Sequence, residues 1–166
     1  MDFDSIFEEL YPSLFRYLHR LTGDGDVAED IAQEAFVRLL KQTLPEQEIR
    51  PWLFTVAMNL VRDRARKSER RQRLLTSAPN LVSRPALPDE DMERVERIQA
   101  VRDVLEQLPE RDRQLLLMRE EGFKYDEIAR VIGVAPASVG TLIARALKKF
   151  VSAFDAREAS TDDPRD

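Results

Sequence analysis

The sequence has no cysteine, one histidine and only five glycines among its 166 residues. Without cysteine there is no disulfide, no thiolate nucleophile and no cysteine-ligated zinc. The shortage of glycine argues against sheets, and no phosphate-binding glycine loop or metal-ligand spacing is present. The lone histidine, His19, lies in an amphipathic helical pattern, where a structural role suits it better than general-base work. We therefore expect no enzyme, no cofactor and no metal site.

Long hydrophobic runs are absent as well. No apolar segment approaches the ~20 residues needed to span a bilayer. The N-terminal sequence MDFDSIFEEL is acidic, where a signal peptide would be basic. Hydrophobic residues make up 43% of the chain and charged residues 34%, which is ordinary for a helical protein. These features predict a cytoplasmic protein without membrane insertion.

The net charge of −5 is unevenly distributed along the chain. Acidic residues dominate positions 1–34, whereas arginine and lysine dominate positions 50–73. This asymmetry suggests two different partners, a basic protein surface and a phosphate backbone. The alternative is that the two regions balance each other within one fold.

Apolar residues recur every three or four positions in the first half, which predicts helices. The apolar positions are Phe3, Phe7, Leu10, Leu14, Leu18 and Leu21, then Val27, Ile31, Ala35, Phe36, Leu39 and Leu40, then Trp52, Leu53, Phe54, Val56 and Leu60. Pro12 marks a kink or a fresh start in the first helix. We expect a capping box at Asp26 and Glu29, a loop up to Arg50 and a helix that begins at Pro51.

Residues 74–92 contain three prolines and no helical period, which predicts a linker. Helices resume beyond it, with Pro109 opening the second of them. The expected buried positions there are Val95, Ile98, Val101, Leu105 and Leu108, followed by Leu115, Leu116 and Met118. Residues 155–166 are polar and are expected to be frayed. The predicted architecture is all-α, with small helical domains over 1–73 and 93–154.

Residues 125–150 read as a helix-turn-helix. Gly133 supplies a stop that tolerates a positive φ, and Pro136 starts a second helix as its first residue. The second helix has an apolar stripe at Val139, Ile143, Ala146 and Phe150. Two short helices joined by such a turn can present the second to a DNA major groove, although an ordinary helical hairpin has the same pattern.

The segment 62–73, RDRARKSERRQR, has the charge density of a helix that follows phosphates. Arg62, Arg66, Arg70 and Arg73 recur at three or four residues, so one face could follow a strand. Asn59 precedes them as a possible reader of bases or backbone. Aromatic residues beside a basic helix can stack on unpaired bases, but for Trp52 and Phe54 core packing is the better interpretation.

Three blocks of the sequence together resemble the extracytoplasmic-function (ECF) sigma factors of bacterial RNA polymerase. They are DVAEDIAQEAFVRLL at 26–40, RPWLFTVAMNLVRDRARK at 50–67 and LPERDRQLLLMREEGFKYDEIARVIGVAPASVGTLIARA at 108–146. The resemblance implies a dissociable polymerase subunit with a clamp-docking helix, a promoter −10 segment and a −35 domain. It also implies core RNA polymerase and promoter DNA as partners, and an anti-sigma factor as a further one.

Carried over by position, the resemblance places Asp30, Gln33 and Glu34 against the basic coiled coil of the polymerase β′ clamp. Their spacing puts them on one helical face. The loop from Lys41 to Arg50 would receive a base flipped out of the −10 element. The residues that would read or grip the opened −10 strand are Asn59, Arg62, Asp63, Arg66 and Arg70.

The second helix of the helix-turn-helix departs from the family pattern. Many relatives carry a basic residue, then serine, then arginine where this chain has Gly140, Thr141 and Leu142. Bidentate readout of guanine is therefore nearly absent from its first half. The expected −35 contacts are Arg130, Ser138, Thr141, Arg145 and Lys148, mostly to phosphate.

Two alternatives to a sigma factor stay open from the sequence. A free-standing helix-turn-helix regulator leaves the acidic N-terminal helices without a role. A helical adaptor that binds only proteins fits the near-neutral second helix but not the arginine-rich segment 62–73.

Overall fold

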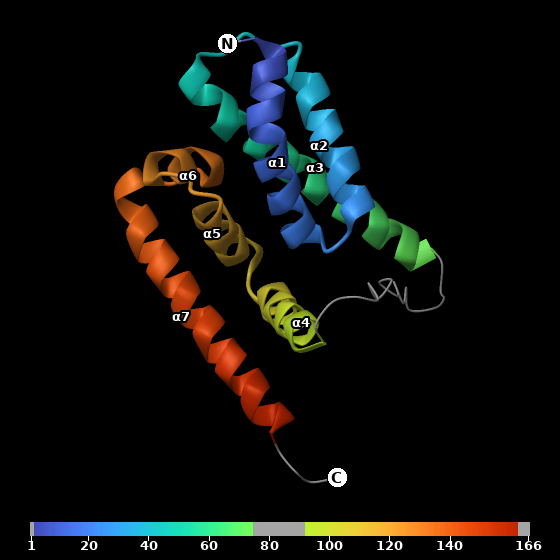
Figure 1. The fold of residues 1–166 in the computed structure, drawn as a ribbon, viewed down its shortest axis with the longest axis vertical. Coiled ribbons are helices and arrows are strands. Elements are labelled where there is room, and N and C mark those ends of the chain that lie inside the picture. Colours follow the sequence, from blue (N-terminus) through green and yellow to red (C-terminus); the bar gives the residue numbers. More distant parts are fainter. Residues whose placement is uncertain (1, 75–91, 163–166) are drawn as a thin grey trace.

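The computed structural model describes residues 2–74 and 92–162, and every regular element in these ranges is an α-helix. The helices are α1 (Phe3–Thr22), α2 (Gly25–Leu39), α3 (Glu46–Leu74), α4 (Met92–Gln107), α5 (Glu110–Glu120), α6 (Tyr125–Ile132) and α7 (Pro136–Thr161). Helices α1–α3 form an N-terminal unit and α4–α7 a C-terminal unit, and the two lie side by side (Figure 1). The all-α prediction is confirmed, and residues 75–91 of the predicted linker lie outside the described ranges.

Helix α1 runs unbroken through Pro12, so the proline neither ends it nor restarts it. Asp2 caps its start by accepting a hydrogen bond from the Ser5 amide at 2.8 Å. Gly23 ends it in the left-handed region at φ 71°, a conformation that side chains with a Cβ rarely adopt. The buried face of α1 contacts α2 and α3 and, beyond the N-terminal unit, α5.

Helix α2 begins one residue before the predicted capping box. The cap is Asp24, whose carboxylate accepts hydrogen bonds from the amides of Asp26 at 3.0 Å and Val27 at 3.2 Å. The prediction of Asp26 as the cap is therefore wrong, because the aspartate two residues earlier already binds the free amides of the first turn. Leu40, predicted to be buried, is 61% exposed and is the C-cap residue, just past the end of the helix.

Helix α3 begins at Glu46, so the predicted start at Pro51 is wrong. A turn with a hydrogen bond from the Glu48 amide to the Pro45 carbonyl at 2.9 Å leads into the helix. Pro51 lies inside the helix, in its second turn, and does not end it. The helix has 29 residues and is therefore about 44 Å long. Its second half projects beyond α1 and α2 (Figure 1).

Only part of the face predicted for α4 is buried: Leu105 and, just after the helix, Leu108 are buried as predicted. Val95, Ile98 and Val101 are 41%, 43% and 38% exposed, whereas Ala100 and Val104 are buried. Helix α7 packs along α4, and its Arg157 pairs with Asp103, next to the buried Val104. A period of three to four residues shows that a helix has a face but does not identify the helix that will cover it.

Helix α7 continues to Thr161, so the prediction of a frayed tail from residue 155 is wrong for 155–161. Arg157 ties this segment to α4 through an ion pair with Asp103 at 2.8 Å. Lys149 makes a second pair, at 2.8 Å, with Asp112, whose side chain is only 11% exposed. The long helix thus spans the C-terminal unit and fixes α4 and α5 relative to each other (Figure 1).

One hydrophobic core runs through both units. Phe54 of α3 is fully buried between Tyr17 of α1, at a ring distance of 5.1 Å, and Phe123, at 4.5 Å. Tyr17 is also fully buried, and its hydroxyl donates to the Met58 sulfur at 3.1 Å. Burial raises the pKa of Tyr17 well above its ordinary value. The prediction of Phe54 as a core residue is confirmed, and Trp52 is partly buried against the same core.

Candidate nucleic-acid interface

The second half of α3 is a basic rod exposed to solvent. Every residue from Arg62 to Leu74 is exposed, because this half has left the bundle that covers the first half. The predicted −10 residues are all exposed and share the outer part of this helix: Asn59, Arg62, Asp63, Arg66 and Arg70. Their recurrence at three to four residues lets a single strand run along one side of the rod.

Arg62 and Arg66 line a cleft of about 530 Å³ between the two units. Its opposite wall includes Glu110 and Arg113 of α5. Arg62 Nε donates to Glu110 Oε1 at 2.8 Å, so one predicted DNA contact is already paired with a carboxylate of the C-terminal unit. A phosphate that approached Arg62 from its Nε side would have to replace Glu110 there.

Helix α2 presents the predicted clamp residues together. Asp30, Gln33 and Glu34 are all exposed, while the opposite face of α2 is buried against α1 and α3. Asp30 pairs with Arg64 of α3 at 3.3 Å, and Glu34 pairs with Arg38 one turn along at 3.0 Å. The acidic and basic regions therefore meet in part within the fold, which is what the alternative interpretation of the charge pattern expected.

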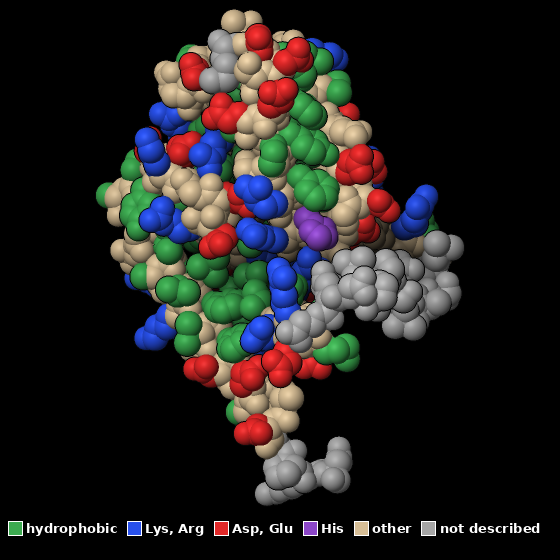
Figure 2. Space-filling model, in the orientation of Figure 1, with side chains coloured by type: hydrophobic (Ala, Val, Ile, Leu, Met, Phe, Trp, Pro, Cys, Tyr) green, Lys and Arg blue, Asp and Glu red, His purple; other side chains and the backbone are tan. Residues whose placement is uncertain are grey.

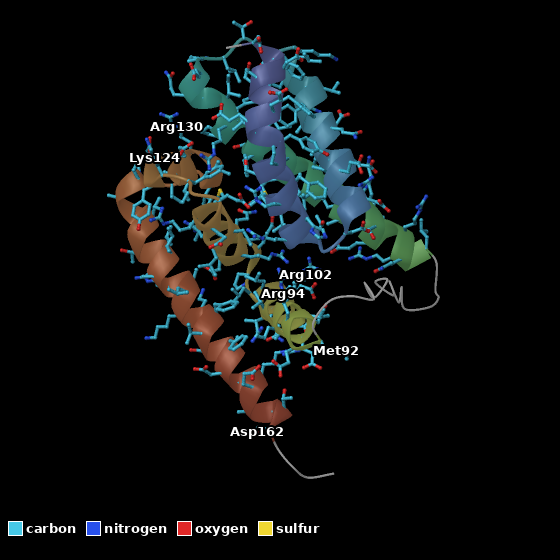
Figure 3. The ribbon with its side chains drawn as sticks, in the orientation of Figure 1. Met92, Arg94, Arg102, Lys124, Arg130 and Asp162 are labelled. Atoms are coloured by element: carbon cyan, nitrogen blue, oxygen red, sulfur yellow. The ribbon has the colours of Figure 1, made fainter. Side chains whose placement is uncertain are left out.

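The helix-turn-helix forms as predicted, with α6 and α7 joined by Gly133 at φ 80°. Pro136 is the first residue of α7, and Ile128 and Val139 are fully buried where the two helices meet. The predicted −35 residues are all exposed: Arg130, Ser138, Thr141, Arg145 and Lys148. Arg130 lies on α6, close to the start of α7 (Figure 3).

The three positions that depart from the family pattern do not face the same way. Thr141 is exposed, whereas Gly140 and Leu142 are half-buried. A Cβ added at Gly140 would lie 3.5 Å from the Tyr125 ring, an ordinary contact, so α6 covers this position. Only Thr141 of the three is therefore on the outward face of α7.

Contacts between the two units were not predicted from the sequence. Glu110 and Glu121 bind arginines more than 45 positions away, so no local pattern marks them. Basic side chains gather beside the single histidine, where α1 meets the C-terminal unit (Figure 2). The one signal in the sequence was the surplus of acidic residues, which does not reveal which of them have partners.

The described residues, 2–74 and 92–162, contain neither a single helix that could span a membrane nor a metal-binding cluster. No single helix there is long and apolar enough to cross a bilayer; only α6 and α7 taken together would be, and they meet at 87°. In the same ranges no three His, Asp or Glu side chains gather in a way that could hold a metal ion.

Comparison with known proteins gives two family matches in chain order. Residues 6–71 match sigma-70 region 2 and residues 98–150 match sigma-70 region 4. The ECF RNA polymerase sigma factor SigL of Mycobacterium tuberculosis strain H37Rv is 30% identical over 142 residues, covering 81% of this chain and 78% of SigL. The chain belongs to the ECF sigma factors. It binds core RNA polymerase and directs it to promoters, and the two alternative functions are not favoured.

Further relatives of this sigma factor match it along most of their length. ECF RNA polymerase sigma factor EcfG of Rhodopseudomonas palustris is 29% identical over 143 residues, covering 84% of this chain and 77% of EcfG. RNA polymerase sigma factor CarQ of Myxococcus xanthus is 26% identical over 152 residues, covering 89% of this chain and 86% of CarQ. The sigma factor RpoE of Bartonella quintana, solved in complex with the anti-sigma factor NepR, shares the fold. It has a TM-score of 0.73 at 20% identity and covers 93% of this chain and 97% of its own.

Proposed function

We propose that this sigma factor divides its work among three surfaces. The acidic face of α2, with Asp30, Gln33 and Glu34, binds the basic coiled coil of the β′ clamp. The exposed half of α3 holds the opened −10 strand, and the start of α7 holds the −35 element. In this scheme the domain of residues 1–73 docks on polymerase and binds −10 DNA, while residues 93–154 bind the −35 element. The observation that supports this proposal is that the clamp residues, the −10 residues and the −35 residues are all exposed in the same structure.

The −10 contact combines phosphate binding with base recognition. Arg62, Arg66 and Arg70, which are exposed, neutralise phosphates along the rod, and the exposed Asn59 hydrogen-bonds a base edge. The segment from Lys41 to Arg50 receives a flipped base, because an unpaired base can be read only outside the stack. Melting is driven by binding energy, and the factor catalyses no reaction of its own.

The −35 contact is weak in base readout and stronger in phosphate binding. Ser138 and Thr141 offer hydroxyls near the N-terminus of α7, while Arg130, Arg145 and Lys148 supply positive charge. Without a bidentate Arg or Lys on the reading side, specificity rests on hydroxyls and thymine methyl contacts. This surface therefore anchors the factor rather than holding promoter DNA alone.

An anti-sigma factor is the proposed regulatory partner in the cytoplasm. The support is the relative RpoE, which was solved with the anti-sigma factor NepR. The anti-sigma factor would compete with core polymerase for binding to this sigma factor.

Promoter-specific run-off transcription tests the function. Core RNA polymerase is incubated with this factor and a library of DNA fragments, and transcript 5′ ends are sequenced. We expect start sites that share upstream elements and that appear only when the factor is added. A well-folded factor that adds no start sites would overturn the proposal.

A further inference from the structure

Exposed apolar residues of α4 line a groove against α1. The groove has a volume of about 490 Å³, and its apolar lining consists of Ile98, Val101 and Leu105 from α4 and Phe15 from α1. Ile98 and Val101 remain 43% and 38% exposed, although they lie beside the core residue Leu105. Apolar side chains that line one hollow from two helices mark a binding site better than scattered surface residues do.

The edges of the groove on α4 are basic. Ile98, Val101 and Leu105 are spaced by three and four residues, so they share one side of the helix. Arg97 and Arg102 precede and follow this apolar set by about one fifth of a turn each, and both line the groove. A ligand lying on the apolar residues therefore has a guanidinium on either side.

Helix α1 supplies further positive charge. Arg16 and Arg20 each lie 3.1 Å from an oxygen of Glu121, but one carboxylate offsets only one of the two charges. Their side chains are 53% and 41% exposed, and a guanidinium has five N–H donors, so both retain donors for another acceptor. His19 stacks on Phe15 with the ring centroids 5.8 Å apart.

No acidic side chain lines the groove among the described residues. Figure 2 shows the basic side chains gathered beside the single histidine, next to apolar ones. A cation is disfavoured there by charge, a bare anion leaves the apolar residues uncovered, and a neutral hydrocarbon leaves the arginines unused. The lining therefore fits a molecule with an anionic head and a hydrocarbon chain.

The size of the groove favours a small ligand over a protein segment. Small-molecule sites have volumes of about 300–1,000 Å³. A specific protein interface buries about 800 Å² per partner, far more than two half-covered aliphatic side chains provide. Among anionic heads a carboxylate suits the rim, because its two oxygens match the fork of a guanidinium.

We propose that the groove between α1 and α4 binds a single-chain fatty acid, with its hydrocarbon chain on Ile98 and Val101 and its carboxylate held by the surrounding arginines. The site shares no residue with the clamp, −10 and −35 surfaces proposed above. It is a ligand-binding activity in addition to the sigma function, and its failure leaves that function untouched.

A fluorescence titration of the full-length factor tests the site. Dansylated undecanoate should brighten when it enters the groove, and dodecanoate at concentrations where it is monomeric should displace it. Acetate lacks the chain and dodecyltrimethylammonium has the opposite charge, so neither should displace the dye. Bound dodecanoate should also raise the midpoint of thermal unfolding, because it binds only the folded chain.

Two variants test the two halves of the site. Arg97→Glu should weaken dodecanoate binding on the order of tenfold, since an attraction becomes a repulsion. Its matched control is Arg111→Glu, an exposed arginine of α5 outside the groove. Val101→Asp should weaken binding at least as much by placing a charge among the apolar residues.

The control for Val101→Asp is Val151→Asp, because Val151 of α7 is 48% exposed and lies outside the groove. Both controls should bind within about twofold of wild type, and far-UV circular dichroism reports whether the helices of each variant are intact. Equal displacement by dodecanoate and dodecyltrimethylammonium, or equal affinity in folded Arg97→Glu and Arg111→Glu, would overturn the proposal.

Two further arms identify a different occupant. Binding to phosphatidylglycerol vesicles without displacement of the dye by monomeric dodecanoate would make the groove a membrane contact. Weaker binding of Arg97→Glu to core polymerase, again without dodecanoate binding, would make it a protein contact. Either result would refute the fatty-acid site.

Discussion

Reversing the charge of Asp30 and Glu34 tests whether the acidic face of α2 docks on polymerase. Asp30→Lys and Glu34→Lys should leave the fold intact, because both side chains are at least half exposed, at 65% and 50%. Their pairs with Arg64 and Arg38 are surface ion pairs, each worth about 0–1 kcal/mol. The free energy of unfolding should therefore change by less than about 2 kcal/mol.

The effect on core binding should be larger than the effect on folding. Two opposite charges 4 Å apart gain about 1 kcal/mol in water, and reversal turns that attraction into a repulsion of similar size. Reversing both residues would cost about 4 kcal/mol without salt. Screening at physiological ionic strength and competition from Arg64 and Arg38 reduce this to roughly 2 kcal/mol, or a 30-fold weaker affinity for core polymerase.

A fluorescence titration of labelled factor with core polymerase measures this affinity. The control is the double variant Glu8→Lys with Glu120→Lys, which changes the net charge equally at two exposed sites away from α2. The control should bind within about twofold of wild type at physiological salt. If the α2 variant binds as tightly as this control, the acidic face of α2 is not the docking surface.

Three further predictions follow from contacts in the two units. Arg66→Ala and Arg70→Ala should each reduce the salt slope of promoter binding by the holoenzyme by about one unit per lost phosphate contact, and a slope equal to wild type places them off the DNA. Asp24→Ala should lower the free energy of unfolding by about 1 kcal/mol in urea titrations, since two amides of α2 lose their acceptor, whereas no change would disprove the cap. Because the pKa of Tyr17 is raised by burial, the unfolded chain loses this proton first, so stability is lost as pH rises above about 10. Tyr17→Phe should make that decline in the free energy of unfolding shallower by about 1.4 kcal/mol per pH unit. If the free energy of unfolding fell equally steeply with pH in wild type and Tyr17→Phe, the prediction would be wrong.

The parts of the fold that local chemistry determines were predictable from sequence. Gly133 and Pro136 mark the turn of the helix-turn-helix because glycine tolerates a positive φ and proline fixes its own φ. The stripe that includes Val139 and Ala146 identified the buried face of α7. The exposure of the predicted DNA and clamp residues follows from the same periodicity.

The parts that depend on distant partners were not predictable in this way. Nothing near Val101 shows that α7 will cover the other side of α4. Segment 155–161 looked frayed because it is polar, yet the pair between Arg157 and Asp103 holds it in place. Glu121 resembles its neighbour Glu120 in sequence, and only the arrival of Arg16 and Arg20 makes it different.

The contact between Phe54 and Phe123 has a consequence for how this protein is handled at the bench. Both rings are fully buried, and each belongs to a different unit. If the chain were cut between the units, each fragment would present a bare aromatic surface to water and tend to aggregate. Fragments for crystallography or binding studies would need a polar residue in place of the exposed phenylalanine.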